Sequence, residues 1–174
     1  AEGDGNPPRG AGRGCRLTRA AQELLLFDLD HTLLDGDSDV EWLRFLIDEG
    51  AGDRGSEEAA NADMARRYRE GTVGTLDFVR FYLRTLAAHP MERLLEWRAR
   101  YLRRSILPRI SDSARTLIAD HQRDGSLVVI VTATNRFPTE LTAGALGVEH
   151  LIATEPEIRD GRFTGEYAGT PSFR

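Results

Sequence analysis

The chain has 174 residues and 40% hydrophobic content, enough for one domain with a packed core, or one domain carrying an insertion. Its formal net charge of −5 argues against a nucleic-acid-binding surface. No apolar run is long enough to span a membrane, and the polar leader lacks the apolar centre of a signal peptide. We therefore expect a cytoplasmic protein that binds neither nucleic acid nor membrane, and its one cysteine, Cys15, excludes a disulfide within the chain.

The first half of the chain predicts one strand followed by helices. Residues 1–20 are rich in Gly, Pro and Arg and are expected to be a disordered leader. The short apolar segment Leu24 to Leu29 is typical of a buried strand. Residues 39–105 then show four helical patterns with no strand between them, which indicates a compact helical unit.

The second half alternates helices and strands. A helix is expected from Ser111 to Asp124, a buried strand from Leu127 to Val131, a helix from Pro138 to Leu146 and a short strand from His150 to Ala153. Asp160-Gly161 is typical of a hairpin turn between residues 157 and 167. This order predicts an α/β fold with a parallel sheet, in which the helical unit is inserted between the first two strands.

Two carboxylates, Asp28 and Asp30, lie where the first strand should end. Side chains on alternate residues of an extended chain project from the same side. Bringing two like charges together costs free energy unless a cation or a proton offsets it. The pair therefore indicates a divalent metal, a shared proton, or a nucleophile beside its acid.

The second strand ends in Thr132-Ala133-Thr134-Asn135. Ligands of open parallel sheets bind beyond the carboxyl ends of the strands, so this segment and the aspartate pair should converge. Asp28 would attack phosphorus as a nucleophile, while Asp30 would protonate the leaving oxygen and then activate water. Mg²⁺ would hold Asp28 and the phosphate oxygens, and the phosphate would also bind the Thr132 hydroxyl and the backbone N–H groups of Ala133 and Thr134.

These residues carry a family resemblance. The segment Phe27-Asp28-Leu29-Asp30-His31-Thr32-Leu33 resembles the first motif of the haloacid dehalogenase (HAD) superfamily, and residues 128–134 resemble its second motif. Residues 131–135, 150–154 and 169–174 are similar to bacterial hydrolases of subfamily IB, and the helical unit resembles the cap of phosphoserine-phosphatase-like members. The resemblance implies a Rossmann-like HAD core with a parallel sheet, made by residues 21–36 and 106–174, and an inserted helical (C1-type) cap, residues 37–105.

The resemblance also assigns roles. It implies that Asp28 is the nucleophile, that Asp30 is the general acid/base, and that the metal binds the Asp28 carboxylate and the Asp30 backbone carbonyl. Thr132 would bind phosphate. Four further residues are candidates for substrate contacts, although ordinary loop or first-turn acids, a solvated arginine and a helix cap are alternative explanations for them: Asp37, Glu41, Arg80 and Asn135.

The family also uses a lysine and a later acidic pair, but this sequence contains no lysine and ends at Arg174 before either would occur. A C-terminally truncated fragment is therefore expected, with activity assigned to the parent protein. That activity is Mg²⁺-dependent hydrolysis of a small polar phosphomonoester, phosphoserine-like, through an aspartyl-phosphate. The alternatives are a phosphotransferase or phosphomutase of the same superfamily, or a non-catalytic truncated HAD-like binding module.

Overall fold

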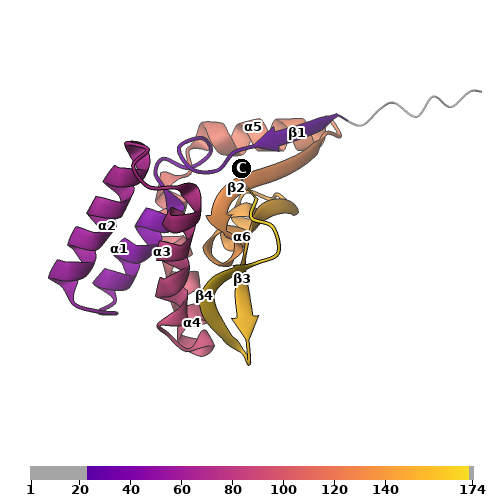
Figure 1. Ribbon diagram of the computed structural model, residues 1–174. Helices are drawn as coiled ribbons and strands as arrows, with labels where there is room; N and C mark the ends of the chain where they lie inside the picture. Colours follow the sequence, from indigo (N-terminus) through magenta and orange to yellow (C-terminus); the bar gives the residue numbers. More distant parts are fainter. Residues whose placement is uncertain (1–22, 173–174) are drawn as a thin grey trace, which may run out of the picture.

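The computed structural model describes residues 23–172, so the expectations for the leader and for Cys15 lie outside the described residues. A four-stranded sheet with the order β1-β2-β3-β4 forms one layer of the molecule (Figure 1). The strands are β1 (Leu24–Phe27), β2 (Leu127–Asn135), β3 (His150–Arg159) and β4 (Arg162–Ala168). The first three are parallel, and β4 pairs with β3 in the antiparallel sense. The predicted α/β class with a mostly parallel sheet is confirmed.

The ends of the strands differ from the prediction for local reasons. β1 ends at Phe27 rather than Leu29, because the Leu29 carbonyl accepts the N–H groups of Thr32, Leu33 and Leu34 in a tight turn. β3 continues from its parallel pairing with β2 into the antiparallel hairpin with β4. At the hairpin turn, Asp160 (φ 51°) and Gly161 (φ 74°) are both left-handed, as the Asp-Gly signal predicts.

The segment between β1 and β2 is helical, as predicted. It contains α1 (Ser38–Asp48), α2 (Arg54–Arg69), α3 (Thr75–Ala87) and α4 (Met91–Tyr101), after which a π-helix (Leu102–Ile106) and a 3₁₀ turn (Leu107–Arg109) follow. Aspartates cap the first two helices, because Asp37 accepts from the Val40 N–H and Asp53 accepts from the Ser56 N–H. No helix among residues 23–172 is both long and apolar enough to cross a membrane.

Two further helices, α5 (Asp112–Arg123) and α6 (Arg136–Ala145), connect the parallel strands. The crossovers from β1 to β2 and from β2 to β3 step in the same direction, so the right-handed rule puts both helices on the same face of the sheet. Phe27 on that face meets His121 of α5 with ring centroids 6.3 Å apart. The alternate residues of β1, Leu24 and Leu26, point to the opposite face and are 55% and 60% exposed.

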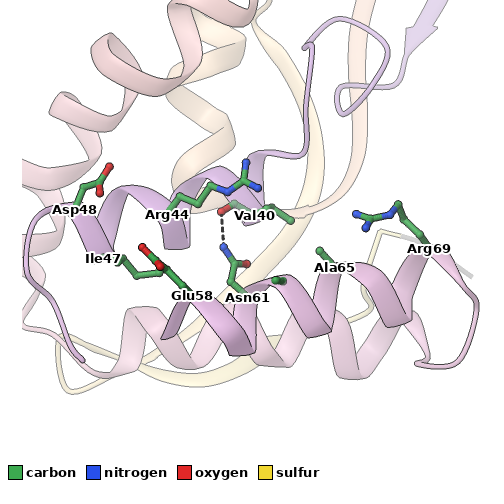
Figure 2. A pocket seen from close by; sticks show the side chains of 9 residues that line it. Val40, Arg44, Ile47, Asp48, Glu58, Asn61, Ala65 and Arg69 are labelled. Carbon is green, nitrogen blue, oxygen red and sulfur yellow. Dashed lines mark hydrogen bonds between the residues drawn. The ribbon is translucent and has the colours of Figure 1, made fainter. Parts of the chain in front are cut away.

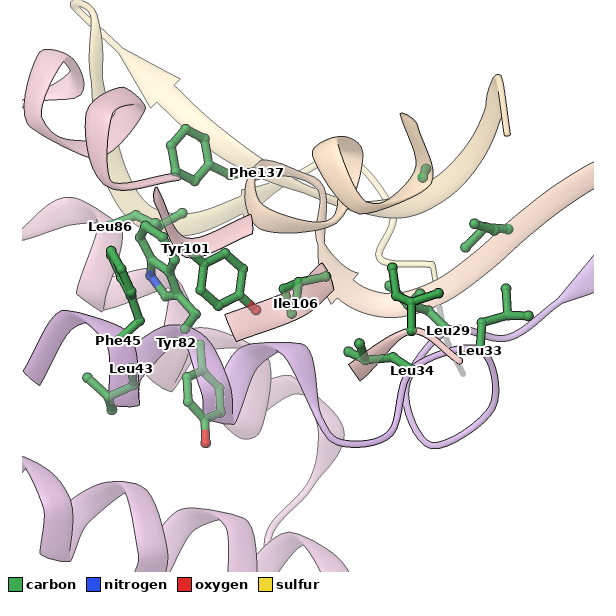
Figure 3. Close-up of a cluster of buried hydrophobic side chains, with 14 of the residues drawn as sticks. Leu29, Leu33, Leu34, Leu43, Phe45, Tyr82, Leu86, Tyr101, Ile106 and Phe137 are labelled. Atoms are coloured by element: carbon green, nitrogen blue, oxygen red, sulfur yellow. The ribbon is translucent and has the colours of Figure 1, made fainter. Parts of the chain in front are cut away.

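One apolar core joins the helical segment to the sheet layer (Figure 3). Trp42 of α1 is fully buried and packs edge-on against Tyr101 of α4 and Phe137 of α6, with ring centroids 5.1 Å and 5.9 Å apart. On another side, α3 packs against β4 at Gly165, where an added Cβ would lie 3.3 Å from Arg84 Cγ. The division into a core and a cap at residues 36/37 and 105/106 stays a prediction.

Candidate active site

The nucleophile candidate Asp28 directly follows β1 and is exposed. The Thr32 hydroxyl donates to Asp28 Oδ2 at 2.9 Å, which fixes the orientation of the carboxylate. The turn is held partly by the His31 N–H, which donates to the Gly36 carbonyl at 3.0 Å, and His31 takes the left-handed conformation (φ 58°). This compact loop presents Asp28 at the carboxyl end of the sheet.

Asp30 belongs to the same loop, and its carboxylate accepts hydrogen bonds from three donors. The Ser38 N–H, at the first residue of α1, donates to Oδ1 at 2.7 Å. The hydroxyls of Thr134 and Thr132 donate to Oδ2 at 2.7 Å and 3.4 Å. Burial raises the pKa of the Asp30 carboxyl above its ordinary value, although the hydrogen bonds from Ser38 and Thr134 oppose that effect. A fixed carboxyl with a raised pKa suits a general acid.

The segment at the end of β2 therefore meets the first loop, as the sequence predicts. Thr132 is 3% exposed, and its hydroxyl oxygen also accepts the Thr134 N–H at 3.2 Å. The Thr132 hydroxyl is thus engaged with both the Thr134 N–H and Asp30, and the Thr134 hydroxyl is engaged with Asp30. The Ala133 carbonyl accepts from the Thr154 hydroxyl at 2.8 Å. Binding of a phosphate at Thr132, Ala133 and Thr134 stays a prediction.

A cavity of about 210 Å³ lies over these groups. Its lining includes His31, the segment 132–134 and four carboxylic acids, of which Asp28 and Asp30 follow β1 and Asp37 and Asp39 lie at the start of α1. The rest of the lining is aromatic and apolar and comes from α2 and α3, through Tyr68, Phe78 and Val79. The helical segment therefore closes the cavity that contains the motif residues.

Two of these acids lie at the start of α1. Asp37 caps the helix through Oδ1, and burial together with the charge of Asp30 raises its pKa to about 6. Asp39 is 1% exposed and accepts from Asn135 Nδ2 at 3.0 Å. Burial, with the charges of Asp37 and Asp30, raises the pKa of Asp39 well above its ordinary value.

The other substrate candidates lie outside the lining of this cavity. Glu41 is bound by Arg44 and by Arg109 Nη2, the latter at 2.8 Å. Arg80 donates to Glu166 at 2.9 Å. Asn135 caps α6 by accepting the Phe137 N–H at 3.2 Å, and contacts the site only through Asp39. Their proposed contacts with a substrate stay predictions.

A larger cavity of about 470 Å³ lies between α1 and α2, away from the motif residues (Figure 2). Its central polar group is Asn61, whose Nδ2 donates to the Val40 carbonyl at 3.0 Å and whose Oδ1 accepts from the Tyr82 hydroxyl at 2.9 Å. These bonds satisfy the amide within the protein. None of the residues predicted for catalysis lines this cavity.

Sequence reasoning missed several contributors to the site. Ser38 supplies the N–H that orients Asp30, and the Tyr101 hydroxyl holds Ser38 by donating to its carbonyl at 2.7 Å. A serine at the first turn of a predicted helix was a usable signal for a free N–H group. Tyr101 and the cavity-lining ring of Tyr68 look like ordinary core positions in the sequence.

The residues present fit a magnesium ion. Asp28 offers an exposed carboxylate, and Mg²⁺ is usually held by one or two carboxylates together with substrate oxygens and water. Within the described part of the chain, no group of three or more His, Cys, Asp and Glu side chains is arranged to hold a metal. The Asp30 carboxylate is occupied by hydrogen bonds, and a metal contact through the Asp30 backbone carbonyl stays a prediction.

Comparison with known proteins identifies the family of the chain. The profile of the haloacid dehalogenase-like hydrolases matches residues 25–174. A histidinol-phosphatase from Neisseria meningitidis is 36% identical over 154 residues, which are 88% of this chain and 69% of that protein. A phosphoserine phosphatase from Archaeoglobus fulgidus is 24% identical over 85% of this chain and 38% of that protein. The chain belongs to the haloacid dehalogenase-like hydrolase family.

Solved structures show the same fold. A protein of unknown function from Bordetella pertussis Tohama I superposes with a TM-score of 0.83 and 45% identity, covering 88% of this chain and 69% of that one. A phosphoserine phosphatase captured as an analogue of its phospho-aspartyl intermediate superposes with a TM-score of 0.61 at 21% identity, over 85% of this chain and 63% of that one. The relatives described above whose activities are named are phosphatases.

Proposed function

We propose that this protein is a phosphomonoesterase of subfamily IB that works through an aspartyl-phosphate on Asp28. The observation that carries the proposal is the pairing of two unlike carboxyls at the end of β1. Asp28 is exposed and oriented by one hydroxyl, whereas Asp30 is held by three donors and has a raised pKa. Carboxyl groups whose surroundings make them unlike are suited to different roles.

In the first step, an Asp28 oxygen forms a bond to phosphorus while the bond from phosphorus to the ester oxygen breaks. Asp30 donates its proton to the leaving oxygen, which departs as an alcohol. In the second step, Asp30 takes a proton from water, whose oxygen attacks phosphorus and releases inorganic phosphate and the free Asp28 carboxylate. Mg²⁺, held by the Asp28 carboxylate and the Asp30 carbonyl, would supply positive charge to the phosphoryl oxygens.

The Thr132 hydroxyl and the N–H groups of Ala133 and Thr134 would bind the phosphoryl oxygens. Because the Thr134 N–H and the Thr132 hydroxyl are paired with each other here, substrate would replace that hydrogen bond. Closure of the cavity by α2 and α3 would exclude water during the first step. We infer a small polar ester as the substrate, because the cavity volume of about 210 Å³ lies below the roughly 300–1,000 Å³ usual for the pockets of drug-sized ligands. We place the reaction in the cytoplasm.

The names of the relatives suggest two candidate esters. The Neisseria protein is named a histidinol-phosphatase, and the archaeal one a phosphoserine phosphatase. L-Histidinol phosphate is an amino-alcohol ester with an imidazole ring, whereas O-phosphoserine carries a carboxylate. Both belong to the class of small amino-bearing phosphate esters.

The test is release of inorganic phosphate from p-nitrophenyl phosphate and from both esters, with Mg²⁺ or with a chelator. Asp28→Asn should abolish turnover, and Asp120→Asn, on the exposed face of α5, should leave it unchanged. Equal turnover by the Asp28→Asn protein would refute the nucleophile. Transfer of phosphate to added alcohol in preference to water would instead assign the chain to the phosphotransferases.

A further inference from the structure

We infer that the cavity selects phosphate esters whose alcohol is cationic and carries a flat ring, and that it discriminates against alcohols that carry a carboxylate. The inference rests on the proposed function, because it concerns the leaving group of the same site. It is carried by the carboxylic acids of the cavity lining and by its aromatic wall, the side chains of Tyr68 and Phe78.

The ionisable side chains that line the cavity are mostly acidic. Four carboxylic acids line the cavity, and among its described lining residues His31 is the one basic side chain. Asp28 and Asp30 are needed for the reaction, but Asp37 and Asp39 lie beside them with no cation among their hydrogen-bond partners. An ammonium group on the leaving alcohol would be attracted to these two acids, whereas a carboxylate would meet like charges at short range.

Arg80 does not offset the negative charge of the cavity lining. It is the one arginine among the predicted substrate contacts, and it pairs with Glu166 and stacks over the Tyr167 ring at 5.3 Å. It lines a separate surface depression with the start of α3 and Pro171. A carboxylate in the cavity would therefore lack the bidentate partner that offsets its desolvation.

The aromatic wall is rigid. Tyr68 stacks on Phe78 with centroids 4.0 Å apart and an interplanar angle of 24°. Phe78 is 5% exposed and packs edge-on against Tyr82, whose hydroxyl is fixed on Asn61. Tyr68 is half-buried and so retains surface for a ligand. A flat or cationic group gains from such a wall through stacking and cation–π attraction.

Two matched pairs of esters test the two parts of the inference, discrimination against a carboxylate and preference for a flat ring. O-Phospho-L-serine and ethanolamine phosphate differ only by the carboxylate, and we expect kcat/KM to be at least about tenfold higher for ethanolamine phosphate. L-Histidinol phosphate and ethanolamine phosphate differ by the ring, and we expect L-histidinol phosphate to be preferred. Tyr68→Leu should reduce that preference about 3- to 10-fold, while Tyr68→Phe and the control Tyr167→Leu should retain it.

Binding of the alcohols separates this inference from the proposed function. Calorimetry with ethanolamine, L-serine and L-histidinol needs no turnover; L-serine differs from ethanolamine by the carboxylate, and L-histidinol differs from it by the ring. We expect ethanolamine to bind at least about tenfold more tightly than L-serine, L-histidinol to bind more tightly than ethanolamine, and Tyr68→Leu to weaken the binding of L-histidinol. Equal or tighter binding of L-serine, or no binding of L-histidinol, overturns the inference. Failure to hydrolyse p-nitrophenyl phosphate, with L-histidinol binding intact, overturns the proposed function instead.

Discussion

Replacing Thr134 by valine tests how the protein holds its acid/base. The substitution removes a hydroxyl that donates to Asp30 Oδ2 at 2.7 Å, and leaves the Ser38 N–H on Oδ1 and the longer 3.4 Å contact from Thr132. Because the lost donor favours the ionised carboxylate, the pKa of Asp30, already raised by burial, should move further upward.

The magnitude follows from the kind of hydrogen bond. Hydrogen bonds to charged groups contribute about 1.5–3 kcal/mol, and we expect the lower end because two donors remain. The folded pKa of Asp30 lies above its unfolded value, so its contribution to stability is present at low pH and is lost as pH rises through the folded pKa. Thr134→Val should therefore cost about 1.5 kcal/mol where Asp30 is ionised, and less at pH near 4.

The measurement is a carbon-13 NMR titration of the Asp30 carboxyl in metal-free buffer, assigned with Asp30→Asn, together with urea denaturation above and below the titration midpoint. Thr134→Ser keeps the hydroxyl and serves as the control. A Thr134→Val titration that superposes on that of the native chain would refute the reasoning.

Three further predictions concern stability. Asp37→Ala should lower the unfolding free energy by about 1 kcal/mol through loss of the α1 cap, and Asp37→Asn should not; equal melting temperatures would contradict this. Asp39→Asn should stabilise the protein at pH 8 but not at pH 4.5. The raised pKa of Asp39 means that the contribution of this group to stability falls as pH rises above about 4. Urea denaturation at the two pH values measures the sign of the change in unfolding free energy. Gly165→Ala should cost about 1–3 kcal/mol, because φ is +89° and the new Cβ approaches α3. The control Gly144→Ala, in open space on α6, should be neutral or stabilising in the same thermal melts.

The order of the elements was predictable because local patterns dominate it. The continuous apolar run of β2 and the left-handed signal at Asp160-Gly161 both form the elements that they predict. The end of β1 was not predictable, because it is decided by a turn in which one carbonyl, that of Leu29, accepts three N–H groups. Such a turn has no periodicity to detect.

The part of the site that lies at the ends of the parallel strands was predictable from the sequence. Asp30 and Thr132 are 102 residues apart and still meet, because adjacent parallel strands bring their carboxyl ends together. The remaining contacts depend on how α1 and α4 dock. The Ser38 N–H donates to Asp30 while the Ser38 carbonyl accepts from Tyr101, 63 residues away in sequence, and no local pattern marks that second pairing.

The charge balance links the chemistry to the substrate. A phosphate ester brings negative charge into a cavity whose described lining contains four carboxylic acids, and transfer of the phosphoryl group depends on offsetting that charge. Burial above all, together with the charges of neighbouring acids, raises the pKa values of Asp30, Asp37 and Asp39, so these carboxyls retain their protons to higher pH. A magnesium ion at Asp28 and an ammonium group beside Asp37 would replace those protons with fixed positive charge. Substrate binding should therefore release protons and tighten as pH rises from about 5 to 7, and calorimetry in buffers of different ionisation enthalpy would measure that release.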